Sequence, residues 1–257
     1  MEFLLVWAIV GFLAQLIDGA LGMAYGVSSN AVLVSIGIAP ALASASVHTA
    51  EIFTTLVSGS SHLRLGNVDR SIALRLIIPG VIGGAVGAYV CTSIPGKPLS
   101  VIVGLILLTM AFLILYRFGL RNVVHFRTER LPSSMLIPLG CVAGFTDAIG
   151  GGGWGPVTTT TLVSTKVIPN RAIGSVNFAE FFVTTSEAIT FLLLIGWENF
   201  NWFVVLGLLI GGAICAPVAA YACKRLPQRV LGVLVGVTIL ILSVRMILKF
   251  ANIWPFP

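Results

Sequence analysis

Long apolar runs, separated by short polar or charged stretches, recur along the whole chain. Six of these runs are about as long as the roughly 20 residues that a helix needs to cross a hydrocarbon core about 30 Å thick. The pattern therefore predicts an all-α polytopic membrane protein. The six predicted spans are residues 41–60, 72–93, 99–118, 172–195, 200–222 and 230–250.

Four other apolar runs are only about 14 residues long, too short to cross the membrane by themselves. They come in two pairs, and a glycine-rich stretch joins the members of each pair. Because irregular backbone at membrane depth survives only when it is buried in protein or lines a cavity, each pair predicts a re-entrant or broken-helix hairpin that reaches the middle of the membrane. Two full crossings in each pair are the alternative. The short runs are residues 3–17, 25–38, 134–146 and 155–168.

The second half of the chain repeats the first. With an offset of 129 residues, positions 11–55 align with positions 140–184. The chain is therefore predicted to consist of a first transmembrane repeat (1–120), a basic cytoplasmic linker (121–133) and a second transmembrane repeat (134–257), and each repeat comprises one hairpin and three transmembrane helices. The identical pairs include Asp18 and Asp147, Gly22 and Gly151, Gly26 and Gly155, and Glu51 and Glu180.

Basic residues are unevenly distributed between the two predicted faces. Short cytoplasmic loops of membrane proteins carry an excess of Lys and Arg, and an orientation with both termini outside places twelve of the fifteen basic residues in cytoplasmic loops. Each repeat then crosses an odd number of times, so the two repeats have opposite orientations, as in many secondary transporters. The predicted location is a bacterial-type inner membrane. The twelve residues are Arg64, Arg70, Arg75, Arg117, Arg121, Arg127, Arg130, Lys166, Arg171, Lys224, Arg225 and Arg229.

The composition agrees with a membrane location and removes a competing interpretation. Apolar residues make up 57% of the 257 residues and charged residues only 9%, against about 25% in soluble domains. The formal net charge of +6 is explained by the basic loops, so no nucleic-acid partner is predicted. The basic linker is expected to contact the lipid bilayer. The four cysteines lie in or beside apolar runs and are interpreted as core residues, and neither a metal nor a cofactor is predicted.

The glycine-rich stretches predict an anion site where the two hairpin tips meet. Each stretch leads directly into a helix, whose N-terminus presents free N–H groups and a partial positive charge. Glycine also lets the backbone approach a ligand closely. The alternative is that these glycines only permit close helix packing in lipid. The candidate substrate-binding residues are Gly22, Tyr25, Gly26, Ser28, Ser29, Asn30 and His48 in the first repeat, and Gly151, Gly152, Gly153, Trp154, Gly155, Thr158, Thr159 and Asn177 in the second.

A polar stripe follows the third segment of each repeat at helical spacing. An ionisable side chain within a span costs about 2.5 to 3.5 kcal/mol on insertion scales, so it is expected to face a partner or a wet cavity. Glu51 and Glu180, together with His48, are candidates for proton coupling or gating, or alternatively for bonds between buried helices. Asp18 and Asp147 belong to the same coupling or gating group, although each could instead cap a helix in its hairpin turn. The stripes are Ser44, His48, Glu51, Thr55 and Ser58, and Asn177, Glu180, Thr184 and Glu187.

The duplicated glycine-rich hairpins, each followed by a small-residue helix, resemble the TauE/SafE family of sulfite and organosulfonate exporters over nearly the whole chain. The first tip departs from the family pattern because it has fewer glycines and no proline. The resemblance implies export of sulfite, sulfoacetate or a related organosulfonate. The matching positions are Gly150 to Gly153, Gly155, Pro156, Pro169, Ala172, Ser175 and Val176, and Gly22, Gly26, Pro40, Ala43, Ser46 and Val47.

The sequence therefore predicts a secondary transporter that exports a small sulfur oxyanion by alternating access. An inside-negative potential favours the exit of an anion by about 2.3 kcal/mol per charge for each 100 mV, and proton coupling is optional. A cation-coupled importer of another small anion on the same fold is the main alternative. A membrane-embedded enzyme or an assembly factor is less well supported, because the sequence has neither a G-x-S-x-G nor an H-E-x-x-H motif. The protein is not expected to be an enzyme, and a homodimer is one candidate assembly.

Overall fold

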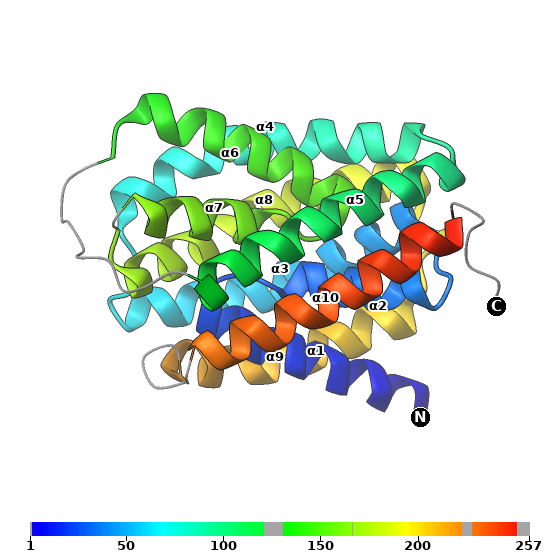
Figure 1. The fold of residues 1–257 in the computed structure, drawn as a ribbon, viewed down its shortest axis with the longest axis horizontal. Helices are drawn as coiled ribbons and strands as arrows, with labels where there is room; N and C mark the ends of the chain where they lie inside the picture. Colours follow the sequence, from blue (N-terminus) through cyan, green and yellow to red (C-terminus); the bar gives the residue numbers. More distant parts are fainter. Residues whose placement is uncertain (1, 121–130, 166, 223–227, 251–257) are drawn as a thin grey trace.

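The structure, a computed structural model, describes residues 2–120, 131–165, 167–222 and 228–250. Within these ranges the regular structure is helical and contains no strand, which confirms the all-α class. Ten α-helices occur there, with a π-helical turn at Tyr116–Leu120 and a 3-10 turn at Trp197–Asn199 (Figure 1). The α-helices are α1 (Glu2–Leu21), α2 (Tyr25–Ser35), α3 (Pro40–Arg64), α4 (Arg70–Ser93), α5 (Gly96–Leu115), α6 (Ser133–Gly150), α7 (Trp154–Ser164), α8 (Pro169–Ile195), α9 (Trp202–Ala222) and α10 (Gln228–Phe250).

Six of the described helices are long and apolar enough to cross a membrane: α1, α4, α5, α6, α8 and α9. This result confirms a multi-pass membrane protein. Helix α3 has 25 residues but carries the polar stripe, and it is not among the six. The apolar stretch found in the described part of α10 is shorter, at Gly236–Arg245.

The expectation that residues 3–17 and 134–146 form half-length helices is wrong. Helix α1 has 20 residues and α6 has 18, and each is long enough to span. The helical hydrogen bonds continue past each aspartate, since the backbone nitrogen of Gly22 donates to the carbonyl oxygen of Asp18 at 2.6 Å and that of Gly151 donates to Asp147 at 2.7 Å. By contrast, α2 and α7 have 11 residues each, a length of about 16 Å or half the hydrocarbon core. Each hairpin therefore combines one long and one short arm.

The main helix contacts join the two halves of the chain. Helix α1 lies along α9 and α6 along α4, while α3 contacts α8 and α5 contacts α10. If α1 to α5 are exchanged, in order, with α6 to α10, the same helix pairs result. Glycines permit the close approach: a Cβ at Gly211 would lie 1.8 Å from the carbonyl oxygen of Ala8, and one at Gly144 would lie 2.3 Å from that of Gly80.

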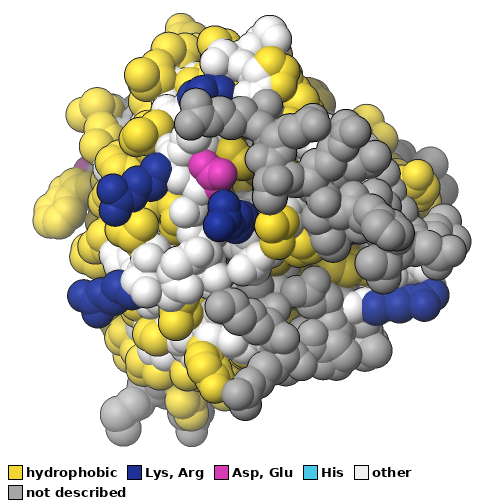
Figure 2. Space-filling view, turned by 90° about the vertical axis from the view of Figure 1, so that its left-hand side faces the viewer, with side chains coloured by type: hydrophobic (Ala, Val, Ile, Leu, Met, Phe, Trp, Pro, Cys, Tyr) yellow, Lys and Arg dark blue, Asp and Glu magenta, His cyan; other side chains and the backbone are white. Residues whose placement is uncertain are grey.

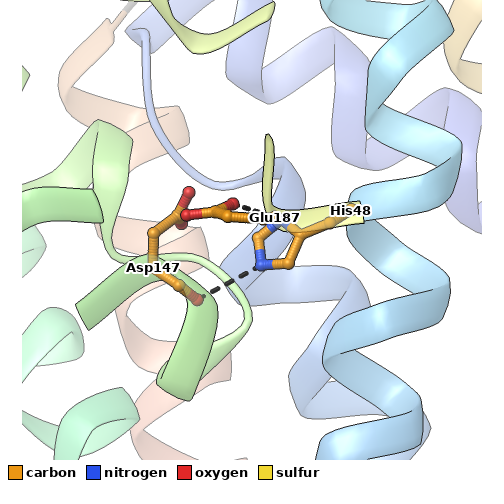
Figure 3. A group of neighbouring side chains, drawn as sticks. All are labelled: His48, Asp147 and Glu187. Carbon is orange, nitrogen blue, oxygen red and sulfur yellow. Dashed lines mark hydrogen bonds and ion pairs between the residues drawn. The ribbon is translucent and has the colours of Figure 1, made fainter. Parts of the chain in front are cut away.

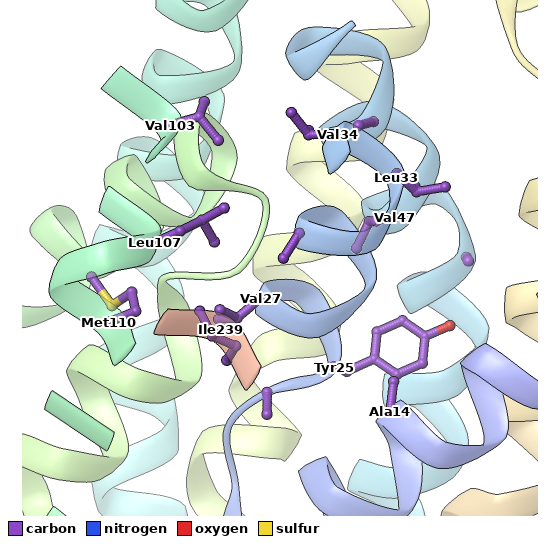
Figure 4. Packing of buried hydrophobic residues seen from close by; sticks show 14 of the residues in the cluster. Ala14, Tyr25, Val27, Leu33, Val34, Val47, Val103, Leu107, Met110 and Ile239 are labelled. Atoms are coloured by element: carbon purple, nitrogen blue, oxygen red, sulfur yellow. The ribbon is translucent and has the colours of Figure 1, made fainter. Parts of the chain in front are cut away.

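The short helix α2 lies in the interior, between α3, α5 and α10 (Figure 4). Eight of its eleven residues are buried. Its packing against three longer helices fixes the direction in which its N-terminus points. The residues that surround it in this core include Val47 of α3, Val103, Leu107 and Met110 of α5, and Ile239 of α10.

The first residue of α1 and the last residue of α10 lie at the same end of the molecule (Figure 1, right). The opposite end carries the junction between α3 and α4, and Lys and Arg side chains are visible on it (Figure 2). Six of the twelve basic residues predicted on the cytoplasmic face, and residues 121–130 of the predicted linker, lie outside the described residues. Which end faces the cytoplasm stays a prediction.

Candidate functional site

The two hairpin tips touch each other in the interior. The first tip joins α1 to α2 at residues 22–24, and the second joins α6 to α7 at residues 151–153. A Cβ at Gly26 would lie 2.8 Å from the carbonyl oxygen of Gly151, and one at Gly152 would lie 1.9 Å from the backbone nitrogen of Val27. Gly22 and Gly151 also have left-handed φ values of 67° and 65°, which favour glycine. The glycine-rich stretches thus place backbone directly against backbone.

Two predicted donors bond to the backbone of the opposite hairpin. Nδ2 of Asn30, on α2, donates to the carbonyl oxygen of Gly150 at 2.6 Å. Oγ1 of Thr159, on α7, donates to the carbonyl oxygen of Gly22 at 2.6 Å. Asn30 and Thr159 correspond under the 129-residue offset, so the hairpins are joined by one bond in each direction.

Other predicted donors are also bonded within the protein. The Tyr25 hydroxyl donates to the carbonyl oxygen of Leu208 at 2.9 Å. Nε1 of Trp154 donates to the carbonyl oxygen of Val176 at 3.2 Å, and Oγ1 of Thr158 donates to that of Trp154 at 2.5 Å. These polar atoms hold the interior together in this conformation.

The remaining polar candidates differ in their surroundings. The hydroxyl of Ser29 is buried and has no hydrogen-bond partner in the described chain, whereas Ser28 is half-buried. Oδ1 of Asn177 accepts a hydrogen bond from Oγ of Ser58 at 2.6 Å, and its Nδ2 donates to the carbonyl oxygen of Ile173 at 3.2 Å. Asn177 therefore joins α8 to α3.

The side chains of Asp18, in α1, and Asp147, in α6, lie beside the N-termini of the short helices α2 and α7. Oδ1 of Asp147 accepts a hydrogen bond from the backbone nitrogen of Trp154, the first residue of α7, at 3.0 Å. Asp18 interacts with the backbone N–H of Tyr25, the first residue of α2. A carboxylate thus sits at each helix N-terminus where an anion was predicted to bind, and its negative charge is favourable there.

A titratable cluster lies directly beside the second tip (Figure 3). Nδ1 of His48 lies 3.0 Å from Oε2 of Glu51 and 3.2 Å from Oε2 of Glu187. Nε2 of His48 lies 3.3 Å from the backbone carbonyl oxygen of Asp147. The four residues come from α3, α6 and α8, and each is at most 3% exposed.

Further carboxyl groups surround this cluster. Asp18 on α1 and Glu180 on α8 are buried, and both interact electrostatically with Glu51. No Lys or Arg is among the buried residues of the described chain. Carboxyl oxygens of Asp147, Glu180 and Glu187 are buried without a hydrogen-bond donor there. The described interior of the bundle is therefore acidic and has no Lys or Arg to neutralise it.

The spacing of this cluster also bears on metal binding, which the sequence did not predict. Ligand atoms of His48, Asp147 and Glu187 lie within 4.8 Å of one another, so by spacing alone these side chains could surround an ion. Both ring nitrogens of His48 instead lie at hydrogen-bond distance from oxygen atoms. We interpret the group as a hydrogen-bonded cluster.

Glu187 is the member of the cluster that the sequence-based set of coupling residues omitted. It lies on the polar stripe of the second repeat, two turns beyond Glu180, and that spacing was the available signal. Its partners are on α3 and α6, which no pattern within one helix reveals.

Comparison with known proteins assigns the chain to a family. A family model described as "Sulfite exporter TauE/SafE" matches residues 7–246. The chain belongs to the TauE/SafE family. The TauE/SafE match includes both tips and the whole titratable cluster.

A curated relative supports the same assignment. The protein named "Probable membrane transporter protein YtnM", from Bacillus subtilis (strain 168), is 44% identical over 252 residues, which cover 97% of this chain and 84% of the relative. No solved structure matches the chain. This TauE/SafE protein is a membrane transporter and not an enzyme.

Proposed function

We propose that this TauE/SafE protein exports a small sulfur oxyanion such as sulfite, sulfoacetate or a related organosulfonate. The family description supports the class of substrate. The observation that carries the proposal is the contact between the tips, because α2 and α7 both begin there. Two helix N-termini, each with a partial positive charge, then meet in one buried region.

The anion would bind between the tips when they separate. In the closed arrangement the carboxylates of Asp18 and Asp147 occupy the N–H groups at the starts of α2 and α7. An anion that enters would take over these groups, together with donors released from the bonds between the hairpins. The proposed donors are the backbone at Gly22, Gly26, Gly151, Gly152, Gly153 and Gly155 and the side chains of Ser28, Ser29, Asn30, Thr158, Thr159 and Asn177.

Alternating access would use two inverted repeats, residues 1–120 and 134–257. The exchange symmetry of the helix pairs supports this proposal. So do the equivalent bonds made by Asn30 and Thr159. If the repeats move as units, the tips become accessible from one face and then from the other.

A flux assay tests the substrate class. Proteoliposomes loaded with sulfite are expected to release it faster than protein-free liposomes. If no other ion accompanies the anion, an inside-negative potential is expected to increase the release. A monovalent anion moving without other ions would reach a concentration ratio of about 50-fold at 100 mV. Parallel measurements with sulfoacetate, sulfate and acetate serve as controls for selectivity. Absence of sulfite and sulfoacetate efflux, with efflux of another anion, would contradict the proposed substrate class.

A cation-coupled importer is the second candidate function. The buried carboxyl groups of Glu51 and Glu180 favour it, because carboxylates are suitable ligands for cations. Uptake of the anion that depends on external sodium would select this alternative over export.

A further inference from the structure

Titratable groups from five helices lie in and around the titratable cluster, and most of them are acidic. They are Asp18 on α1, Tyr25 on α2, His48 and Glu51 on α3, Asp147 on α6, and Glu180 and Glu187 on α8. Helix α4 contributes no charge at this place, since it meets Glu187 with Gly84. Isolated ions are very unfavourable in a low-dielectric interior. Some of the five carboxyl groups must therefore carry protons.

The surroundings of His48 show where protons belong. Its Nδ1 faces carboxylate oxygens of Glu51 and Glu187, and its Nε2 faces the carbonyl oxygen of Asp147. A neutral imidazole has one N–H donor, and an imidazolium has two. With oxygen acceptors at both nitrogens, the doubly protonated ring fits this site.

Asp147 and Glu187 form a second proton position. A carboxyl oxygen of Asp147 and one of Glu187 lie within 4.8 Å of each other. Oδ2 of Asp147 and both carboxyl oxygens of Glu187 lack a hydrogen-bond donor among the described residues. Two ionised carboxylates offer only acceptors and repel each other. The contact is therefore stable when one of the two carries a proton.

The two halves differ at this position. Under the 129-residue offset His48 corresponds to Asn177, and Glu187 corresponds to Ser58. Both pairs connect α3 with α8: the Ser58 hydroxyl donates to Asn177 at 2.6 Å, and His48 lies 3.2 Å from Glu187. The same contact between halves thus occurs twice, once with neutral side chains and once with titratable ones.

We propose that His48, Glu51, Asp147 and Glu187 form a proton-binding site that loads a proton together with the transported anion. The link is Asp147, whose carboxylate holds the N–H of Trp154 at the start of α7. An anion that binds this N–H must displace the carboxylate of Asp147 from it and remain close to the negative charge of that carboxylate. A proton on Asp147 removes that charge, so anion binding and proton binding favour each other.

The proton and the anion would therefore cross in the same direction. The proton enters from water on the loading side, resides on the Asp147 and Glu187 pair, and returns to water on the other side as the carboxylate regains the N–H of Trp154. A monovalent anion that takes one proton with it transfers no net charge. Its flux would then respond to a pH difference and lose its response to the potential.

The inference rests on the proposed anion transport, and its test separates the two. Proteoliposomes containing a pH-sensitive dye are used with sulfite as the probe. Wild-type protein is expected to move protons with sulfite, Glu187→Gln is expected to abolish this proton movement, and Glu187→Asp is expected to restore part of it. The matched control is Ser58→Ala, at the neutral counterpart, which is expected to leave proton movement unchanged. Equal proton movement per sulfite in wild type and Glu187→Gln would overturn the proposal.

A measurement without substrate decides the matter if wild-type protein moves no sulfite. Infrared difference spectra between acidic and alkaline pH report the carbonyl band of protonated carboxyl groups. This band is expected in wild type and in Ser58→Ala, and a weaker band is expected in Glu187→Gln. Identical spectra for wild type and Glu187→Gln would overturn the proton site. A stoichiometric metal ion in purified protein that is lost in Glu187→Gln would also overturn it, in favour of a metal site.

Discussion

At the scale of single residues, the contact between the tips depends on glycines, which have no side chain to keep the two backbones apart. Gly26 lies within α2 and has no left-handed φ, so its role is confined to the space that it leaves. A Cβ at this position would lie 2.8 Å from both the carbonyl oxygen of Gly151 and the Cα of Gly152. The backbones of both hairpins would have to shift to admit a methyl group.

The substitution Gly26→Ala is expected to destabilise the protein by about 1 to 3 kcal/mol, the usual range for overpacking. Thermal unfolding of purified protein in detergent would show a lower midpoint than wild type. Gly96→Ala is the matched control, because no atom lies within 4 Å of a Cβ at Gly96. Equal unfolding midpoints for the two variants would contradict this expectation, because the tips would then accommodate the methyl group without loss of stability.

The sequence located the groups of the candidate site but not their pairing. Glycine positions, the polar stripes and the two aspartates were evident from spacing within single segments. The contact of His48 with Glu187 joins residues 139 positions apart, and it depends on which faces of α3 and α8 meet. Side-chain donors such as Asn30 were assigned to a ligand because their partners, backbone carbonyl groups of the other hairpin, are invisible in a residue pattern.

At the scale of the elements, helix ends were the hardest feature to predict. The aspartate and glycine near residues 18 and 147 were interpreted as the ends of short helices, yet α1 continues to Leu21 and α6 to Gly150. A buried aspartate that bonds to the next helix is compatible with a helical backbone, as Asp147 shows. The predicted short runs 25–38 and 155–168 were closer to the observed helices α2 and α7, because the length of an apolar run directly limits the length of the helix that it forms.

The beginning of α4 provides a test of capping outside the interior. The carboxylate of Asp69 accepts hydrogen bonds from the backbone nitrogens of Ser71 at 2.9 Å and Ile72 at 3.3 Å. Asp69→Ala is expected to lower stability by about 1 kcal/mol, and Asp69→Asn is expected to retain most of it. Chemical or thermal unfolding in detergent measures the difference. An Asp69→Asn variant as unstable as Asp69→Ala would indicate that charge, and not capping, is important.

At the scale of the whole molecule, the two predicted repeats are interlocked. Helix α1 of the first half lies along α9 of the second, and α6 of the second half lies along α4 of the first. The predicted boundary between residues 120 and 134 therefore separates similar sequences without separating two independent cores. The repeat was detectable from the sequence, whereas this mutual packing required the three-dimensional arrangement.

Neither half is expected to be stable alone. Residues 1–120 or 121–257 expressed separately would expose the glycine-lined faces that the other half covers, and we expect degradation or aggregation. Co-expression of the two fragments is expected to give a complex that purifies through a tag on either one. A single fragment that purifies as a monodisperse, thermally stable protein would contradict this expectation.

The glycine contact at the centre has a consequence for how the molecule opens. Exposed side chains change rotamer within nanoseconds, so a constriction closed by such side chains can open while the backbone stays in place. At Gly26 and Gly152 there is no side chain to rotate, so the obstruction consists of main chain on both sides. Under the proposed mechanism, thermal rotamer changes would not create a leak there, and passage would require displacement of an entire helical hairpin.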